Sequence, residues 1–422
     1  MSTITDGRSD PMNNQNMPLV SIVTPSFNQA AFIEETIQSV LIQDYPYIEH
    51  IVVDGGSVDG TLEILKKYSH LGNRFRYISE PDRGQSDAIN KGLKMARGDI
   101  IGWLNSDDTY LSGAVSKAVA ALQKHSEWAM VYGKAYHIDE NSQIMNSYPV
   151  QSFDREDLFH FCIICQPAAF VRKNIFTAVG SIDNDLNFCM DYDLWIRISK
   201  DYPIGHIEDY LANSRLHSAC KSVAQITKIL PEIMKTSVKH FGTVANEWLY
   251  HFLQHYSQMG VFWYLSLFKK YDVLGTTPQI LDMNGYSDLW VPPNFRVSIQ
   301  VDPQYPLHLL MIKGINQISS DLSCDVSVNG REVQRYNIPS REFILKILVD
   351  SKISNNVIEI FSDRHIVPAE LGINSDTRTL SFLIEELIPL SVEEYSFYQE
   401  FQKGPAYALA WMQKNRHPIP SL

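Results

Sequence analysis

At 422 residues the chain is too long for a single hydrophobic core, so we expect two or three domains. Hydrophobic residues make up 45% of the chain and charged residues 20%, as in ordinary globular proteins. The net charge of -12 argues against nonspecific binding to nucleic acid, which depends on cationic contacts to phosphate, so we expect no nucleic-acid partner.

The cysteines and the N-terminus indicate a reducing compartment. Five cysteines are a sparse and odd set for a disulfide scaffold, and we interpret Cys162 and Cys165 in the apolar run FCIIC as core residues. Residues 1–17 are polar, without the apolar segment of a signal peptide, and no run is long enough to span a membrane. We expect a cytoplasmic protein, with the inner face of the membrane as the other location to consider.

After a flexible tail at residues 1–17, strands alternate with amphipathic helices. We expect strands at 19–24, 48–54, 75–79 and 99–104, each followed by apolar residues at helical spacing. This alternation indicates βαβ units and a mainly parallel sheet, whose ligands bind beyond the carboxyl ends of the strands. Each of those ends carries polar residues, at 25–28, 54–57, 80–84 and 105–108, although such loops are polar in any case.

The fourth strand lies in DIIGWLNSDD (99–108) and delivers two adjacent carboxylates, Asp107 and Asp108, into a loop. An ionised Asp is rarely buried unless it is paired or binds a metal. Hard oxygen ligands at this place suit Mg²⁺ or Mn²⁺, particularly when diphosphate oxygens complete the shell. The alternative is that one of the two caps the helix expected near Ser112.

The pattern changes along the second half of the chain. Strands are expected at 129–150 and 166–172, a helix at 191–199 and a hairpin or edge segment at 204–217. Residues 223–284 form a helical, aromatic segment that either packs on the first domain or lies on a membrane as an amphipathic helix. Short alternating strands at 285–390 predict an all-β sandwich, and a helical tail follows at 391–422.

Six motifs together resemble family 2 glycosyltransferases of GT-A fold, in the order found in that family. They are TPSFNQ (24–29), VDGGSVDGT (53–61), EPDRGQSDAINKG (80–92), WLNSDD (103–108), MDYDLW (190–195) and RLH (215–217). The resemblance covers residues 18–222 and implies an α/β domain with a Rossmann-like mixed sheet. Residues 285–390 resemble accessory domains that follow some bacterial glycosyltransferases.

The resemblance also implies an activity. It is the metal-dependent transfer of a sugar, with inversion, from a nucleoside diphosphate sugar to a hydroxyl of a glycan or lipid-linked acceptor. Bacterial surface polysaccharide or glycan synthesis is the expected setting, and peripheral membrane association fits such an acceptor. The sequence does not identify the sugar, the base, the acceptor or the choice between Mn²⁺ and Mg²⁺.

The same resemblance assigns roles to individual residues. Asp191 would be the general base, with a helix N-cap as its alternative role. Asp108, more directly than Asp107, would hold Mn²⁺ or Mg²⁺, together with His217. Arg215 and Lys221 are either phosphate contacts or solvated charges. The donor would contact Pro25, Ser26, Asn28, Asp54, Arg83, Asp87, Ser106 and Asp107.

Three other classes of protein fit the sequence less well. A nucleotidyltransferase would need a basic, Gly-rich triphosphate loop after the first strand, and TPSFNQ is not one. A Rossmann dehydrogenase would need GxGxxG, a spacing that DGGSVDG lacks. An inactive glycan-binding or scaffold protein would not need Asp108 and Asp191, both of which are present.

Overall fold

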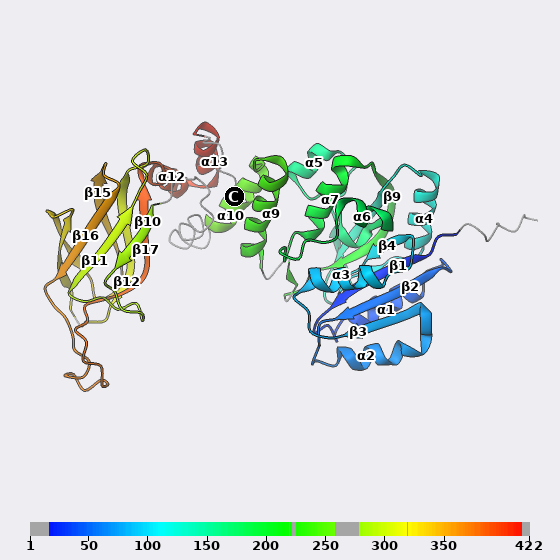
Figure 1. The fold of residues 1–422 in the computed structure, drawn as a ribbon, viewed down its shortest axis with the longest axis horizontal. Coiled ribbons are helices and arrows are strands. Elements are labelled where there is room, and N and C mark those ends of the chain that lie inside the picture. The colour runs from blue at the N-terminus through cyan, green and yellow to red at the C-terminus, as the bar shows by residue number, and fades with distance from the viewer. Residues whose placement is uncertain (1–16, 219, 222–224, 258–277, 319, 416–422) are drawn as a thin grey trace, which may run out of the picture. The chain divides into compact units, whose positions relative to one another are not determined.

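The computed structural model describes residues 17–218, 220–221, 225–257, 278–318 and 320–415. Contacts within the chain divide it into two units, residues 1–240 and 241–422, which are described separately (Figure 1). The domain boundaries expected at residues 222, 284 and 390 stay predictions.

A mixed sheet forms the centre of the first unit, as the resemblance implied. Its strand order is β3 (Phe75–Ser79), β2 (Ile48–Asp54), β1 (Val20–Ser26), β4 (Ile100–Trp103), β8 (Ala169–Arg172), β6 (Met130–Ile138), β9 (Ile204–Arg215) and β5 (Thr109–Tyr110), with β7 (Ile144–Ser147) paired to β6. The first four of these strands are parallel neighbours, whereas β8 runs antiparallel to both β4 and β6. The expected α/β fold class with a mixed sheet is confirmed.

Helices cover both faces of this sheet because successive strand residues point to opposite sides. Val52 of β2 packs in one apolar cluster with Ile33 of α1 (Ile33–Leu41) and Leu65 of α2 (Thr61–Tyr68). Its neighbour Val53 packs in another cluster with Ala88 of α3 (Gln85–Met95). The remaining helices of this unit are η2 (Ser69–Arg74), α4 (Ala114–Lys124), α5 (Arg155–His160), η3 (Gln166–Ala168), α6 (Lys173–Val179), α7 (Met190–Asp201) and α9 (Ile226–Phe241).

Strand register brings the polar strand ends together. Ser26 at the end of β1 lies beside Asp54 of β2, and Asp54 lies beside Ser79 of β3. On the other side of β1, Val23 lies beside Trp103 at the end of β4. The four loops expected to carry a site therefore leave the sheet at one edge.

Two expected elements differ from the structure. Residues 166–172 begin as the 3-10 turn η3 rather than as a strand, and Pro167, which has no backbone N–H to give to a sheet, lies in that turn. Residues 204–215 form one continuous strand, β9, instead of a hairpin. This strand is paired on both sides, with β6 and with the short β5.

The second unit contains two antiparallel sheets around one apolar core, as the sandwich expectation predicted. One sheet has the order β10 (Gln279–Met283), β11 (Asn294–Gln300), β16 (Asn355–Ser362), β13 (Leu322–Val328) and β14 (Arg331–Ile338). The other has β15 (Arg341–Ser351), β12 (Leu307–Asn316) and β17 (Leu383–Ser391). Their inward side chains share one buried cluster.

Helices accompany the sandwich within the second unit. They are α10 (Asn246–Ser257), α12 (Val392–Lys403) and α13 (Pro405–Lys414), and α12 starts with a capping box formed by Ser391 and Glu394. No helix in the described ranges is both long and apolar enough to cross a membrane. The aromatic stretch VFWYLSLF (261–268), considered for a membrane surface, lies outside the described residues.

Candidate active site

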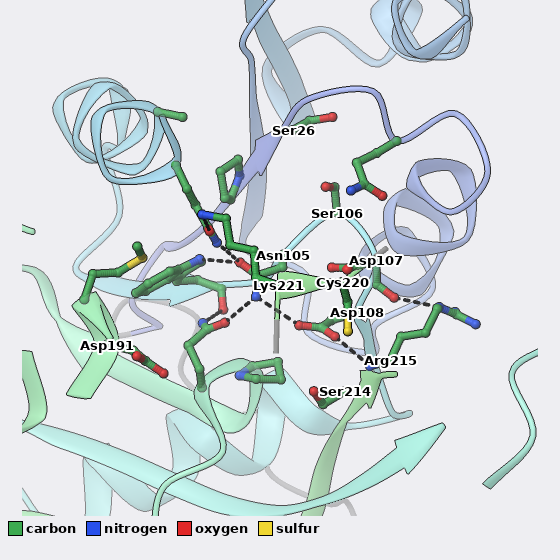
Figure 2. A pocket seen from close by; sticks show the side chains of 18 of the residues that line it. Ser26, Asn105, Ser106, Asp107, Asp108, Asp191, Ser214, Arg215, Cys220 and Lys221 are labelled. Atoms are coloured by element: carbon green, nitrogen blue, oxygen red, sulfur yellow. Dashed lines mark hydrogen bonds between the residues drawn. The ribbon is translucent and has the colours of Figure 1, made fainter. Parts of the chain in front are cut away.

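A cavity of about 720 Å³ opens where the four strand-end loops meet. This volume suits a ligand of nucleotide-sugar size. Six of the residues predicted for the site line it: Pro25, Ser26, Ser106, Asp107, Asp108 and Asp191. Figure 2 shows Asp191 on the α7 side of the cavity and Asp107 and Asp108 on the opposite side of the view, with Lys221 between them.

The two adjacent carboxylates of the loop after β4 have different environments. Asp108 is buried, and its oxygens accept hydrogen bonds from the Arg215 backbone N–H at 2.9 Å and the Asn105 amide at 3.2 Å. Burial raises the pKa of Asp108 well above its usual range, and the charge of Asp107 adds to this effect. Asp107 is partly exposed and lies beside His217, with 3.2 Å between Oδ2 and Nε2.

These contacts distinguish the two predicted metal ligands. Asp108 accepts a hydrogen bond at each oxygen, whereas Asp107 and His217 contact each other, and the metal-binding roles of all three stay predictions. No group of three or more His, Cys, Asp and Glu side chains is arranged to hold a metal in the described part of the chain. The pair nevertheless fits Mn²⁺ or Mg²⁺, which typically take one or two protein ligands and complete their shell with phosphate and water.

Arg215, the last residue of β9, is buried and supports the loop that carries Asp107, so it is not a solvated charge. Its buried guanidinium donates to the backbone oxygens of Asp107 and Asp139, at 2.8 and 3.0 Å, and to the Ser142 hydroxyl at 2.9 Å. It also pairs with Glu35 at 2.6 Å. The side chain thus fixes the loop that carries Asp107, while its own backbone N–H fixes Asp108.

A chain of hydrogen-bonded polar side chains lines the cavity and was largely missed from the sequence. Asn105 joins Gln166, at 2.9 Å, to Gln85, also at 2.9 Å, and Gln85 accepts from Lys221 Nζ at 2.9 Å. Burial lowers the pKa of Lys221. Gln85 lies within the motif EPDRGQSDAINKG and could have been selected there, whereas nothing in the sequence marks Gln166.

Asp191 lies at the start of α7 as expected. It is the second helical residue, and the cap position belongs to Cys189, so the alternative role as an N-cap is wrong. Its Oδ1 accepts the backbone N–H of Tyr192 at 2.8 Å. The pKa of Asp191 is raised to about 6, mainly by burial and also by the charge of Glu232. The hydrogen bond from Tyr192 acts in the opposite direction.

Asp193, two residues later, faces away from the cavity, as its position on the helix predicted. It is fully buried and binds Arg197 at 2.7 Å and His240 of α9 at 2.7 Å. Burial raises the pKa of Asp193, but these partners outweigh that effect and hold the pKa well below its usual range. The two carboxylates of MDYDLW therefore have opposite environments.

Five other predicted site residues do not line the cavity. Four of them bind other protein groups. Asp54 accepts hydrogen bonds from the backbone of Gly56 and Ser57 and from two serine hydroxyls. Asn28 Oδ1 accepts the N–H of Val58 at 3.0 Å, and Arg83 and Asp87 pair with each other at 3.5 Å. The fifth, His217, contacts Asp107, which lines the cavity. The donor-binding roles of Asn28, Asp54, Arg83 and Asp87 stay predictions.

Comparison with known proteins identifies the family of the first unit. Residues 21–180 match the model of glycosyl transferase family 2. The chain is 30% identical over 213 residues to chondroitin synthase of Escherichia coli, covering 50% of this chain and 31% of that protein. It is 29% identical over 211 residues to hyaluronan synthase of Pasteurella multocida, covering 50% and 22%. The chain thus spans less than a third of the length of either synthase.

Two solved structures are also similar. Staphylococcus aureus TarS 1–349 in complex with UDP has a TM-score of 0.44 and 17% identity, covering 60% of this chain and 80% of that one. Mannosyltransferase PcManGT of Pyrobaculum calidifontis, in complex with GDP-Man and Mn²⁺, has a TM-score of 0.41 and 17% identity, covering 54% and 64%. Because both scores are below 0.5, the assignment rests on the sequence match and the sheet described above. Within the first unit, residues 21–180 belong to glycosyl transferase family 2, and the sheet of this unit is that of the GT-A fold.

Proposed function

We propose that the protein transfers a sugar, with inversion, from a nucleoside diphosphate sugar to an acceptor hydroxyl, and that Asp191 is the general base. The observation that supports this most strongly is the placement of Asp191 in one cavity with the Asp107–Asp108 loop. A single displacement requires a carboxylate that faces the acceptor, away from the group that stabilises the leaving diphosphate.

The donor would occupy the end of the cavity formed by the loops after β1, β3 and β4. Pro25 and Ser26 line this end, and the buried hydroxyl of Ser26 has no hydrogen-bond partner within the described part of the protein. A ligand oxygen or nitrogen would satisfy that hydroxyl. Asp82 also lines the cavity, where the absence of a side chain at Gly55 gives it room.

The leaving diphosphate would lie next to Asp107 and Lys221. Asp107 and His217 would hold Mn²⁺ or Mg²⁺, which, when bound, neutralises the charge that develops on the diphosphate oxygens. Lys221 is held at the cavity by Gln85 and by the backbone oxygen of Asn187, at 2.9 and 2.8 Å. Its ammonium group would bind a phosphate oxygen directly.

The acceptor would lie on the Asp191 side of the cavity. With a pKa of about 6, Asp191 is mostly ionised at neutral pH and yet basic enough to accept a proton. It would remove the proton from the acceptor hydroxyl as the oxygen attacks the sugar carbon and the bond to the diphosphate breaks. Aromatic and apolar residues also line the cavity, including Tyr148, Ile164, Phe188 and Met190.

The relatives guide the choice of substrates to test. Because two of them are named chondroitin synthase and hyaluronan synthase, we propose a glycan acceptor and a role in polysaccharide synthesis. UDP-, GDP- and dTDP-sugars should be screened with Mn²⁺ and with Mg²⁺ for thermal stabilisation and for release of nucleoside diphosphate. Product configuration should then be determined by NMR. Retention of the anomeric configuration, or release of pyrophosphate as by a nucleotidyltransferase, would overturn the proposal.

A further inference from the structure

Helix α9 lies after the last family motif, and one face of it contacts the segment that carries Asp191. Its contact residues Glu232, Thr236, Lys239 and His240 recur at helical spacing. Thr236 contacts Cys189 at 3.2 Å, and both Lys239 and His240 bind Asp193, at 3.3 and 2.7 Å. The start and the first turns of α7 are therefore held by a helix that follows the last family motif.

The first residue of this face, Glu232, binds the backbone of the three residues that precede α7, of which only Cys189 contributes a terminal N–H of the helix. The first N–H groups of a helix have no partner within the helix and are normally satisfied by a capping side chain. Cys189, at the cap position of α7, makes no side-chain capping bond. Instead, the carboxylate of Glu232 accepts the backbone N–H groups of Asn187, Phe188 and Cys189, at distances between 2.7 and 3.1 Å.

We propose that Glu232 is a positioning residue for the base, fixing the start of α7 and so the place of the Asp191 carboxylate. This inference rests on the proposed role of Asp191 and extends it. Cys189 is the last residue whose N–H binds Glu232, and Asp191 follows it by two residues. Motion of the backbone at the start of the helix would therefore move the Asp191 carboxylate. Misplacement of a reacting group by 1 Å can cost about 10²-fold in rate.

Glu232 also acts on Asp191 through its charge. Four other titratable groups face Asp191, and burial raises the pKa of each, so they are neutral at pH 7: Tyr148, Cys162, Cys165 and Cys189. Glu232 is the charged group that raises the pKa of Asp191, and it also interacts with Lys221. Removing the negative charge should lower the pKa of Asp191 and let it ionise at lower pH.

Two variants separate the geometric effect from the charge effect. Glu232→Gln keeps one carbonyl oxygen to accept from Phe188 and Cys189 but removes the charge. We expect the acid limb of the kcat/KM profile to move to lower pH, with kcat at high pH within about threefold of wild type. Glu232→Ala removes the acceptor and should lower kcat by about tenfold or more, with the donor KM unchanged.

A measurement without turnover tests the same contact. Hydrogen exchange of the peptide containing residues 187–190 should be faster in Glu232→Ala than in wild type, because three amides lose their acceptor. Lys235→Ala is the matched control, since Lys235 is an exposed residue on the same helix, and it should match wild type in exchange, kcat and pH profile.

The outcomes distinguish this inference from the proposed function. If Asp191→Asn remains active, the assignment of the base is wrong and the inference falls with it. If Asp191→Asn is inactive but Glu232→Gln keeps the wild-type acid limb and Glu232→Ala keeps wild-type exchange, only the positioning role is overturned. Should the alanine variant not fold, an unchanged acid limb in Glu232→Gln alone overturns it, because that variant keeps the acceptor and loses only the charge. A loss of thermal stability in Glu232→Ala with unchanged kcat and pH profile would also overturn it, because Glu232 would then be merely structural.

Discussion

Replacing Arg215 by methionine tests whether this residue supports the loop after β4 or binds phosphate. The guanidinium makes hydrogen bonds of 2.8 Å to Asp107 O, 3.0 Å to Asp139 O, 2.9 Å to Ser142 Oγ and 2.6 Å to Glu35. Glu35 is 46% exposed and can be rehydrated, so its loss adds little. Ser142 is also exposed and can be rehydrated, whereas each of the two backbone oxygens costs about 1–3 kcal/mol when left unpaired. We therefore expect Arg215→Met to lower the free energy of unfolding by about 2–6 kcal/mol.

The assay is urea unfolding combined with calorimetric titration of the nucleoside diphosphate. Lys221→Met is the control, because Lys221 lies at the cavity with two hydrogen bonds and has no comparable set of buried acceptors. It should lower nucleotide affinity by about tenfold and change stability by less than about 1 kcal/mol. Our reasoning is refuted if Arg215→Met unfolds like wild type and loses nucleotide affinity, since Arg215 would then be a phosphate contact.

Three further predictions concern the metal pair, the second carboxylate of MDYDLW and the extent of the catalytic unit. Asp107→Asn should weaken Mn²⁺-dependent binding of nucleoside diphosphate by at least about tenfold in calorimetry, and binding that is equal with Mn²⁺ and with EDTA would exclude the metal. Asp193→Asn should lower the free energy of unfolding by about 3–5 kcal/mol at pH 7. The pKa of Asp193 is depressed in the folded state, so the difference in unfolding free energy between wild type and variant should shrink as the pH falls below the ordinary pKa of an aspartate. A difference that stays constant with pH would contradict the ion pairing. A protein ending at residue 241, which keeps α9, should still hydrolyse donor slowly, whereas one ending at 222 should lose kcat because it lacks α9. Equal rates would show that α9 is dispensable.

The sequence predicts the sheet and the location of the site well, for a physical reason. Apolar periodicity and polar strand ends are local signals, and the parallel register that follows from βαβ units brings those ends to one edge. The bounds expected for β2 and β3, 48–54 and 75–79, agree with the structure. Strand β9 was not predicted as one element because its pairing with both β6 and β5 is a long-range property.

The sequence does not distinguish a polar residue that binds a ligand from one that holds its own loop. Asp54 ends strand β2 and Asp191 lies in the first turn of α7. Asp54 is saturated by hydrogen bonds from its loop and Ser79, whereas Asp191 accepts one from Tyr192. Arg215 was open to either reading until its buried partners were known. Glu232 contacts the start of α7 from more than 40 residues away, so no local motif could reveal it.

The most direct test of the account is Asp191→Asn, measured for sugar transfer, donor binding and stability. The rise in the pKa of Asp191 from 3.8 to about 6 means that its charge costs the folded state about 3 kcal/mol above pH 6, and asparagine avoids this cost. We predict that kcat falls by about 10²–10⁴-fold while the donor Kd stays the same and the free energy of unfolding at pH 7.5 is unchanged or higher. In the wild type, activity should fall as the pH drops through about 6, because the base becomes protonated. Near-normal turnover by a folded Asp191→Asn variant would contradict the central claim.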